Sequence, residues 1–340
     1  MQTPEQERRQ DWIDISRGIG VILVVYGHVL GGLVRAGLFP AGSVASLMDY
    51  TLYTFHMPLF FFLAGVNVPH SLAKGTRPFL LAKLWTIAYP YVLWSLIQGT
   101  VIMVFSKDAN IPIYPSDIAA IGYRPIGQFW FLYALLICHV LAVLIPNRIA
   151  FFALAIVGLF IFEVSDSRSG LPLLLHHLPL YVAGIVLNAR MQTSAASAAR
   201  NWLIFVLILT GFSGAVAFGD SVVARDSLGW SALPACVLGI AATVLFSKLV
   251  KGRMAGWLAV VGRMSMTIYV LHILISSAAR LILVRLHVPL DAVAYLVIIT
   301  AAGVALPVTI HVALDRLQLL GLVGLAPLHR QRNARSESTW

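Results

Sequence analysis

Apolar residues run through the chain in long stretches that short polar segments separate. A helix needs about 20 residues to cross a bilayer, and ten stretches approach that length. They cover residues 15–34, 46–66, 79–105, 126–146, 149–164, 171–188, 201–218, 229–247, 256–283 and 291–312. The pattern predicts an all-α fold, a polytopic membrane helix bundle of about ten transmembrane helices. Counts of nine and eleven stay open, because the fifth and sixth stretches are short and Pro172 and Pro179 interrupt the sixth.

The composition agrees with a membrane protein. Hydrophobic residues make up 59% of the chain and charged residues 11%, whereas a soluble domain has about 45–50% and about 25%. The net charge of +10 does not indicate a nucleic-acid partner, because basic residues of membrane proteins collect in their cytoplasmic loops. The two cysteines, Cys138 and Cys236, each lie alone in an apolar stretch, which predicts small buried side chains.

The distribution of basic residues predicts the orientation of the chain. With ten spans, fifteen of the 24 Lys and Arg residues fall on the side of the two termini and seven on the other, so both termini are expected in the cytoplasm. The first span holds Asp14, Arg17 and His28 and has no small-residue cleavage site after it, so we expect it to be retained. Residues 1–326 are expected to form one transmembrane domain, and residues 327–340 a disordered cytoplasmic tail.

Two ionisable residues, Arg17 and His28, lie eleven positions apart in the first apolar stretch. Eleven residues of α-helix turn through about 1100°, so both side chains leave nearly the same face about 16 Å apart. An ionisable group inside a membrane costs about a few kcal/mol and marks a functional site by default. The alternatives are structural: Arg17 pairs with Asp14 or reaches the headgroups, and His28 bonds a neighbouring helix.

Other polar residues also lie inside the apolar stretches. His56 lies about 15 Å from the outer end of the second stretch, so we expect it to meet His28 near the middle of the membrane. The fourth, sixth and ninth stretches add Trp130, Tyr133, His139, His176, His177, Tyr269 and His272. For each of these histidines, a hydrogen bond between helices is the structural alternative. No metal is expected, because carboxylate neighbours and His-x-x-x-His spacings are missing from the sequence.

The missing motifs narrow the chemistry. Acidic residues are scarce inside the spans, which disfavours a proton-coupled transporter. The chain has no Gly-x-Ser-x-Gly elbow, Walker loop or His-Glu-x-x-His motif, so it lacks the signatures of a serine hydrolase, an NTPase and a zinc protease. An imidazole deprotonates a hydroxyl or accepts an acyl group covalently, and a guanidinium holds an acidic donor. The pair of His28 and Arg17 therefore fits acyl transfer.

Four segments together resemble a known family. They are the Arg-x10-His spacing of Arg17 and His28, Phe-His-Met-Pro-Leu-Phe-Phe-Phe-Leu-Ala-Gly at 55–65, Gln-Phe-Trp-Phe-Leu at 128–132, and Ser-x-x-x-Tyr-x-x-His at 265–272. These segments resemble motifs of the acyltransferase 3 family of integral membrane acyltransferases. The resemblance spans most of residues 11–275 and is closest to the fucose 4-O-acetylase-like branch, which adds acetyl groups to sugars of cell-surface or secreted polysaccharides.

The resemblance implies a function and a location. The expected donor is cytoplasmic acetyl-CoA or another acyl-CoA, used as a co-substrate with no permanently bound cofactor. The expected acceptor is a hydroxyl of a glycan or glycolipid, and the expected location is the bacterial inner membrane.

The resemblance also implies roles for individual residues. His28 is the expected catalytic base and Arg17 its essential partner. Family members have a basic residue early in the third span, and Lys83, with Arg77 before it, approximately matches that position. Together with Lys74, these two residues are expected to bind the phosphates of the donor. The residues expected to line the acceptor tunnel are His56, Trp130, Tyr133, Tyr269 and His272.

Two rival functions stay open. One is a polytopic transporter or flippase of a glycan or small molecule, which the shortage of intramembrane acids disfavours. The other is a partner protein without catalytic activity, such as a sensor or an assembly subunit.

Overall fold

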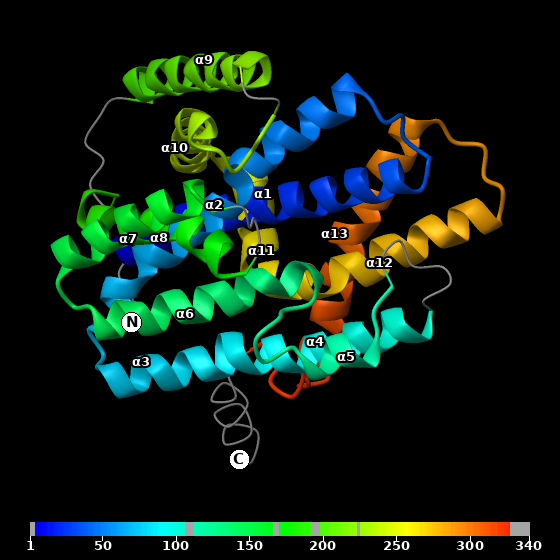
Figure 1. Cartoon of the computed structure of the whole chain (residues 1–340), viewed down its shortest axis with the longest axis horizontal. Coiled ribbons are helices and arrows are strands. Elements are labelled where there is room, and N and C mark those ends of the chain that lie inside the picture. Colours follow the sequence, from blue (N-terminus) through cyan, green and yellow to red (C-terminus); the bar gives the residue numbers. More distant parts are fainter. Residues whose placement is uncertain (1–3, 106–111, 166–169, 192–197, 223–224, 327–340) are drawn as a thin grey trace. The chain divides into compact units, whose positions relative to one another are not determined.

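The computed structural model describes residues 4–105, 112–165, 170–191, 198–222 and 225–326 (Figure 1). Every regular element within these residues is a helix, which confirms the predicted all-α class. The tail predicted for residues 327–340 lies outside the described residues.

The chain forms two compact units. The first consists of residues 1–63 and 187–308, and the second of residues 64–186 and 309–340. The boundaries fall inside three helices that contribute to both units: α2 (Ser43–Leu72), α8 (Leu171–Met191) and α13 (Ala292–Arg316). The predicted site residues of the first, second and ninth apolar stretches all belong to the first unit.

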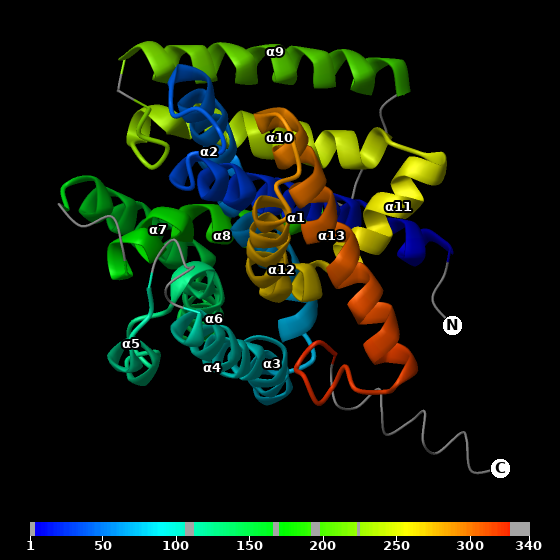
Figure 2. The same ribbon diagram turned by 90° about the vertical axis from the view of Figure 1, so that its right-hand side faces the viewer.

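The first unit is arranged around its N-terminal helix. Besides parts of the three shared helices it holds α1 (Pro4–Arg35), α9 (Ala198–Val222), η4 (Trp230–Ala232), α10 (Leu233–Leu249), α11 (Gly252–Arg263) and α12 (Ser265–Arg285). α1 packs against α10, α11 and α12. α9 lies along α10 in both views (Figures 1 and 2). Only 11% of the most apolar window of α9 is buried inside the structure, so most of its surface is available to lipid.

The apolar core of the first unit also forms on α1. Val21 and Val25 of α1 are buried in one cluster with Ile268 of α12 and Ile299 of α13. Gly303 allows the close approach of α13, since a Cβ there would lie 2.8 Å from Val25 Cγ1. Lipid tails are as apolar as these side chains, so close packing between helices supplies the stability here.

Contacts within the first unit give the direction of α2 and α10 relative to α1. α2 runs antiparallel to α1, because Gly20 packs against Phe60 whereas Gly27 packs against Tyr53. α10 also runs antiparallel to α1. It passes Phe55 of α2 at Gly239, and near its C-terminal end Lys248 Nζ lies 5.1 Å from the ring centroid of Trp12, close to the start of α1.

α9 and α12 run in the same direction as α1. α9 is antiparallel to α10, because Phe205 stacks on Phe246 with centroids 5.7 Å apart and Gly211 lies against Leu238. α2 therefore runs toward one side of the first unit, and α9 begins on that same side. In a membrane, this requires an even number of crossings between these two helices.

The second unit supplies those crossings. Its helices are α3 (Thr76–Lys83), η1 (Leu84–Ala88), α4 (Tyr89–Val104), α5 (Pro115–Ala119), η3 (Gly127–Phe129), α6 (Trp130–Leu144), α7 (Arg148–Glu163) and most of α8. The segment after α13 packs on α4, since Tyr89 Oη donates to the Leu322 carbonyl at 2.6 Å and Trp94 Nε1 to the Val323 carbonyl at 3.0 Å.

A π-helical turn joins α3 to α4. η1 follows directly on Lys83, and Pro90 is among the first residues of α4. A proline has no N–H to donate to the preceding turn, and a π-turn is a wider turn that often marks a functional position. α3, η1 and α4 together form one continuous apolar helix, Thr76–Val104.

Within the described residues, nine helices are long and apolar enough to cross a membrane. They match nine of the ten predicted stretches. The tenth, α7, has 16 residues and is about 24 Å long, shorter than the roughly 30 Å hydrocarbon core. Its start is fixed by Asn147, whose side chain accepts hydrogen bonds from the backbone N–H groups of Ile149 and Ala150. With this length, α7 is not among the nine candidate spans of the described residues, and the count of ten stays a prediction.

Two predicted boundaries need comment. The stretch predicted as one span over 256–283 is two helices, because α11 ends at Arg263 and α12 begins at Ser265. That prediction was wrong, and the end of α11 coincides with the backbone contact of Gly262 with α1. The alternative that Pro172 and Pro179 break the sixth stretch is not realised, since α8 continues through Pro179.

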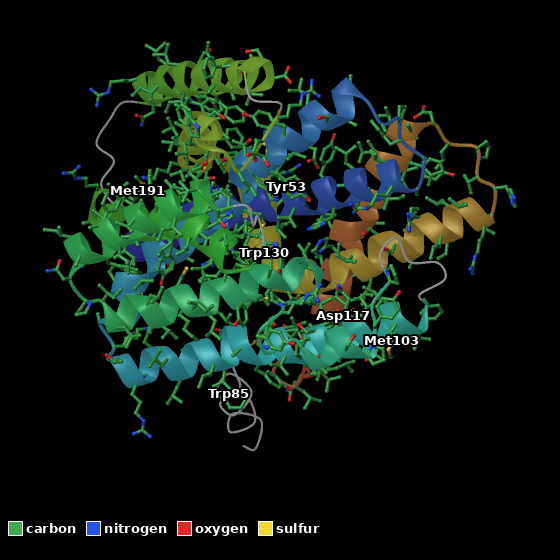
Figure 3. All side chains as sticks on the ribbon, viewed as in Figure 1. Tyr53, Trp85, Met103, Asp117, Trp130 and Met191 are labelled. Atoms are coloured by element: carbon green, nitrogen blue, oxygen red, sulfur yellow. The ribbon has the colours of Figure 1, made fainter. Side chains whose placement is uncertain are left out.

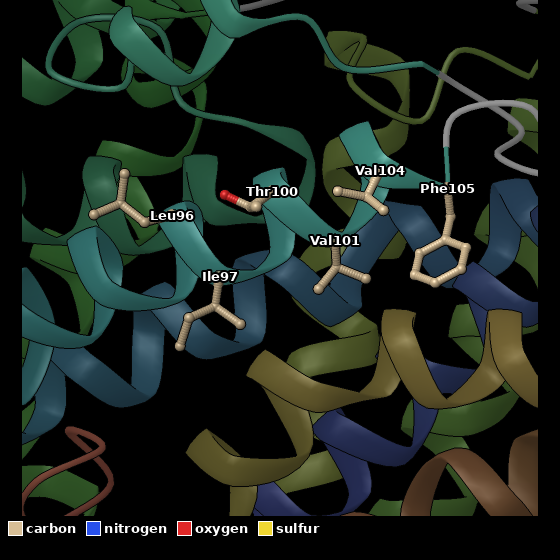
Figure 4. Close-up of a pocket in the computed structure, with 6 residues that line it drawn as sticks. All are labelled: Leu96, Ile97, Thr100, Val101, Val104 and Phe105. Carbon is tan, nitrogen blue, oxygen red and sulfur yellow. The ribbon is translucent and has the colours of Figure 1, made fainter.

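The surface of α4 carries a shallow apolar hollow (Figure 4). It is lined by Leu96, Ile97, Thr100, Val101, Val104 and Phe105. Its one hydroxyl is that of Thr100, and it contains no titratable side chain. The hollow therefore suits a lipid chain and offers no group for acyl-transfer chemistry.

Candidate active site

His28 of α1 and His272 of α12 lie side by side in the first unit. Their ring centroids are 5.1 Å apart, and the ring planes are tilted by 45°. His272 is completely buried, whereas His28 is partly exposed. The imidazole of His28 is thus the accessible one of the two, and the ring of His272 lies on the side of His28 that faces the protein interior.

The ring of Tyr53 of α2, labelled in Figure 3, contacts the rings of both His28 and His56. Its ring meets that of His28 edge-on with centroids 6.4 Å apart, and that of His56 edge-on with centroids 4.7 Å apart. The expected contact between His28 and His56 thus runs through Tyr53, which was not predicted as a site residue. Its position three residues before His56, on the same helix face, is the signal that identifies it.

Two of these three histidines are held by their own helices. His56 Nδ1 donates to the Leu52 carbonyl at 2.6 Å, and His272 Nδ1 to the Tyr269 carbonyl at 2.7 Å. A carbonyl only accepts, so Nδ1 carries the proton in each ring and Nε2 is left as an acceptor. His272 Nε2 is buried and has no hydrogen-bond partner among the described residues.

His28 differs from both. Within the described part of the chain its ring makes no hydrogen bond. The structural alternative, a bond to a neighbouring helix, is therefore not realised there. His28 is the histidine of this cluster whose ring nitrogens are available to a ligand.

Arg17 shares an aspartate with Arg263 of α11. Arg17 Nη1 lies 3.6 Å from Asp14 Oδ1, and Arg263 Nη1 lies 3.9 Å from Asp14 Oδ2. The pairing of Arg17 with Asp14 considered from the sequence is thus present, and the same carboxylate also faces Arg263, with Asp11 as a second acidic group nearby. The side chains of Arg17 and Arg263 are 36% and 54% exposed, so both are accessible to an anion.

Two glycines bring these charges together. A Cβ on Gly262 of α11 would overlap the carbonyl of Asp14 and lie 2.9 Å from the Gly18 nitrogen. A Cβ on Gly18 would in turn overlap the carbonyl of Leu258. The backbones of α1 and α11 are therefore in direct contact, as small residues permit between membrane helices, and Arg263 follows that contact immediately.

The residues predicted to bind the donor phosphates belong to the second unit. Lys74 and Arg77 are exposed. Lys83 is half-buried, and its Nζ lies 5.2 Å from the ring centroid of Phe79, which is a cation–π distance. Phe79 also stacks on His139, with centroids 5.6 Å apart. Lys83 thus points to the aromatic interior of this unit, whereas the other two residues face outward.

Trp130, labelled in Figure 3, and Tyr133 were predicted to line the acceptor tunnel, and both belong to the second unit. The ring of Trp130 lies 5.3 Å from that of His177, and the ring of Tyr133 lies 5.8 Å from that of Tyr91. Tyr269, in contrast, lies in the first unit, with its ring 6.2 Å from that of His272. The structure thus places five predicted residues, Arg17, His28, His56, Tyr269 and His272, in the first unit together with Tyr53.

A family model described as an acyltransferase domain matches residues 10–312. The chain belongs to this acyltransferase family. With its nine long apolar helices among the described residues, it is a multi-pass membrane acyltransferase. The resemblance found in the four sequence motifs is thereby confirmed.

This acyltransferase is similar to the nodulation protein NolL of Mesorhizobium japonicum (strain LMG 29417 / CECT 9101 / MAFF 303099). The two are 24% identical over 204 residues, which make up 58% of this chain and 52% of the relative. The chain thus spans about half the length of the curated relative that it matches. No solved structure matches the acyltransferase.

The site of the acyltransferase is built from amino-acid side chains. Among the described residues, no group of three or more His, Cys, Asp or Glu side chains is arranged to hold a metal ion. What the first unit offers is an imidazole available for proton or acyl transfer at His28 and an exposed pair of guanidiniums at Arg17 and Arg263.

Proposed function

We propose that this acyltransferase moves an acetyl or other short acyl group from a cytoplasmic acyl-CoA to a hydroxyl of a cell-surface or secreted glycan or glycolipid. The observation that carries the proposal is the state of His28. Its ring makes no hydrogen bond within the described residues, while His56 and His272 beside it are tied to carbonyls of their own helices. A general base must be reachable and must have a nitrogen available for the proton that it removes.

His28 acts as the general base in this proposal. One of its ring nitrogens takes the proton of the acceptor hydroxyl, and the oxygen attacks the thioester carbonyl carbon. The carbon–sulfur bond breaks, coenzyme A leaves as a thiolate, and the proton held by His28 neutralises that sulfur. A route through an acyl group carried on His28 balances in the same way, with the hydroxyl attacking in a second step.

Arg17 and Arg263 hold the acidic donor. A guanidinium presents a planar fork of donors that suits phosphate and carboxylate groups. The exposure of both guanidinium side chains supports this role for the two arginines. Lys83, Arg77 and Lys74 bind further phosphates of the donor.

We further propose that the acyltransferase resides in a bacterial inner membrane with both termini in the cytoplasm. The even number of crossings between α2 and α9 supports a total of ten spans, with both termini on one side. The excess of Lys and Arg residues on that side supports a cytoplasmic location of both termini.

The test is coenzyme A release from acetyl-CoA by the purified protein, with and without a glycan acceptor. We expect release that depends on the acceptor, and a loss of about 100-fold or more for His28→Ala, since positioned acid–base groups contribute about 10²–10⁴-fold. His70→Ala is the matched control, because His70 is an exposed histidine at the end of α2. Full activity of His28→Ala would refute the role of His28. Transport of the glycan without release of coenzyme A would favour the rival transporter.

A further inference from the structure

The buried imidazole of His272 has one ring nitrogen without a hydrogen-bond partner in the described part of the chain. His272 of α12 is 0% exposed, and this nitrogen is its Nε2. The other nitrogen, Nδ1, lies 2.7 Å from the Tyr269 carbonyl and 3.1 Å from the Ile268 carbonyl. Since carbonyls only accept, the ring proton is on Nδ1 and Nε2 is an acceptor. A buried acceptor costs free energy unless a donor pairs with it, so Nε2 marks a position where a donor is expected.

His28 is the neighbour best placed to supply that donor. The centroid of the His28 ring lies 5.1 Å from that of His272, whereas the ring of Tyr269 lies 6.2 Å away. Imidazole rings whose centres are about 5 Å apart bring facing nitrogens within about 3 Å of each other, which is the length of a hydrogen bond. The ring of His28 makes no hydrogen bond within the described residues, so none has to break when that ring turns toward His272.

The tautomer of His28 decides whether this histidine is able to act as a base. A neutral imidazole takes a proton only through the nitrogen that carries none, and the hydrogen bond of the other nitrogen determines which one that is. Nε2 of His272 selects the form of His28 whose N–H points to the protein interior. The second nitrogen of His28 then faces the exposed side of the ring. When that nitrogen takes a proton, His28 becomes an imidazolium and still donates its first N–H to His272.

We propose that His272 is a positioning residue of the acyltransferase. Its Nε2 accepts a hydrogen bond from a ring N–H of His28, and this bond holds the other nitrogen of His28 toward the acceptor hydroxyl. The inference rests on the proposed function, in which His28 removes the proton of that hydroxyl. His272 itself exchanges no proton and touches no substrate, because its ring is completely buried.

Two substitutions of His272 separate the acceptor at Nε2 from the rest of the imidazole. The amide of His272→Gln is long enough to reach the place of Nε2 and offers an oxygen that accepts. The amide of His272→Asn is one carbon shorter, so it replaces Nδ1 near the Tyr269 carbonyl and leaves no acceptor at the place of Nε2.

Kinetics of coenzyme A release compare the two variants. We expect His272→Asn to lower kcat by about tenfold or more, since His28 is no longer oriented, and to change the KM for acetyl-CoA by less than about twofold. His272→Gln should retain most of kcat. Equal losses of kcat in the two variants, or full activity of His272→Asn, would overturn the proposal.

The tautomer of His28 is a second readout, which a purely structural role of His272 would not change. Nitrogen NMR of the full chain with isotope-labelled histidine, at alkaline pH where the rings are neutral, distinguishes protonated from unprotonated ring nitrogens. The signals lost in His28→Ala assign those of His28. We expect one tautomer of His28 in the wild type and a mixture in His272→Asn. A mixture in the wild type would refute the hydrogen bond even if the His272 variants fail to fold.

His139→Asn is the matched control for the loss of a buried imidazole. His139 is 1% exposed, and its Nδ1 donates to the Leu135 carbonyl at 2.7 Å, as His272 Nδ1 does to its own helix. His139 belongs to the second unit, so His139→Asn should leave the tautomer of His28 unchanged. A mixture of tautomers in this control as well would contradict a specific effect of His272.

The two readouts separate this inference from the proposed function. A single tautomer of His28 in a protein that releases no coenzyme A would leave the hydrogen bond standing and overturn the proposed function. Acceptor-dependent release that is lost in His28→Ala but fully retained in His272→Asn would overturn this inference and leave the proposed function standing.

Discussion

The contact between α1 and α11 predicts the effect of one added methyl group. Gly262→Ala places a Cβ 2.6 Å from the carbonyl carbon of Asp14 and 2.9 Å from the nitrogen of Gly18. Ordinary contacts of a Cβ begin at 3.4 Å and the carbonyl oxygen of Asp14 lies closer than its carbon, so α11 has to move away from α1 by more than about 0.8 Å. The opposing atoms are backbone atoms of α1, so no side-chain rotation relieves the overlap.

The cost follows from this displacement. Overpacking of a close contact costs about 1–3 kcal/mol, and Gly→Ala in a helix returns about 1 kcal/mol through helix propensity. Gly256 lies on the same helix with no atom within 4 Å of its Cβ position, so Gly256→Ala gains the propensity term without the overlap. We therefore expect Gly262→Ala to be less stable than Gly256→Ala by about 1–3 kcal/mol.

The measurement is thermal unfolding of the two variants in the same detergent, with coenzyme A release as a second readout. Gly262→Ala should unfold several degrees below Gly256→Ala. Its affinity for acetyl-CoA should also fall, because moving α11 carries Arg263 away from Asp14 and Arg17. Equal unfolding temperatures would refute the backbone contact between α1 and α11 as the structure describes it.

Three further predictions follow from other contacts. Gln98 and Gln128 exchange two buried hydrogen bonds at 3.0 and 2.8 Å, so either single change to Leu should destabilise the protein by about 1–3 kcal/mol. The double change should cost less than the sum, as a double-mutant cycle of unfolding measures. Arg263→Gln should raise the KM for acetyl-CoA several-fold and leave kcat largely unchanged, and a loss of kcat alone would contradict a donor-binding role. Cysteines introduced at residues 146 and 165, at the two ends of α7, should react with membrane-impermeant reagents from opposite sides, and labelling of both from one side would refute a crossing by α7.

The sequence predicted the helices well because apolar length is a local property. Nine of the ten predicted stretches have a counterpart among the described helices that is long enough to cross. The break between α11 and α12 was missed, because the stretch over 256–283 was predicted as one span although Gly262 and Arg263 interrupt it. α11 ends at Arg263, directly after Gly262, which lies against the backbone of α1, and the sequence alone does not reveal that contact between two helices.

The candidate site was predicted in part for a similar reason. Helix periodicity places Arg17 and His28 on one face of α1, and their spacing was visible in the sequence. Tyr53 was missed because a tyrosine in an apolar stretch is an ordinary core residue. Its role becomes visible only when its ring is found between those of His28 and His56.

Three positions of α1 have partners on α11 or α12, and these partners follow in the same order along the chain. Arg17 is joined through Asp14 to Arg263, His28 lies beside His272, and the backbone at Gly32, near Arg35, accepts from Arg280. The order is preserved only because α12 runs in the same direction as α1. Successive spans alternate in direction, and α2 and α10 run opposite to α1, the first span. A span parallel to α1, as α12 is, must therefore be odd-numbered. α12 is the ninth span if α7 crosses the membrane and the eighth if α7 does not. The observed pairing of α1 with α12 therefore requires α7 to cross, and evidence against a crossing by α7 would also count against that pairing.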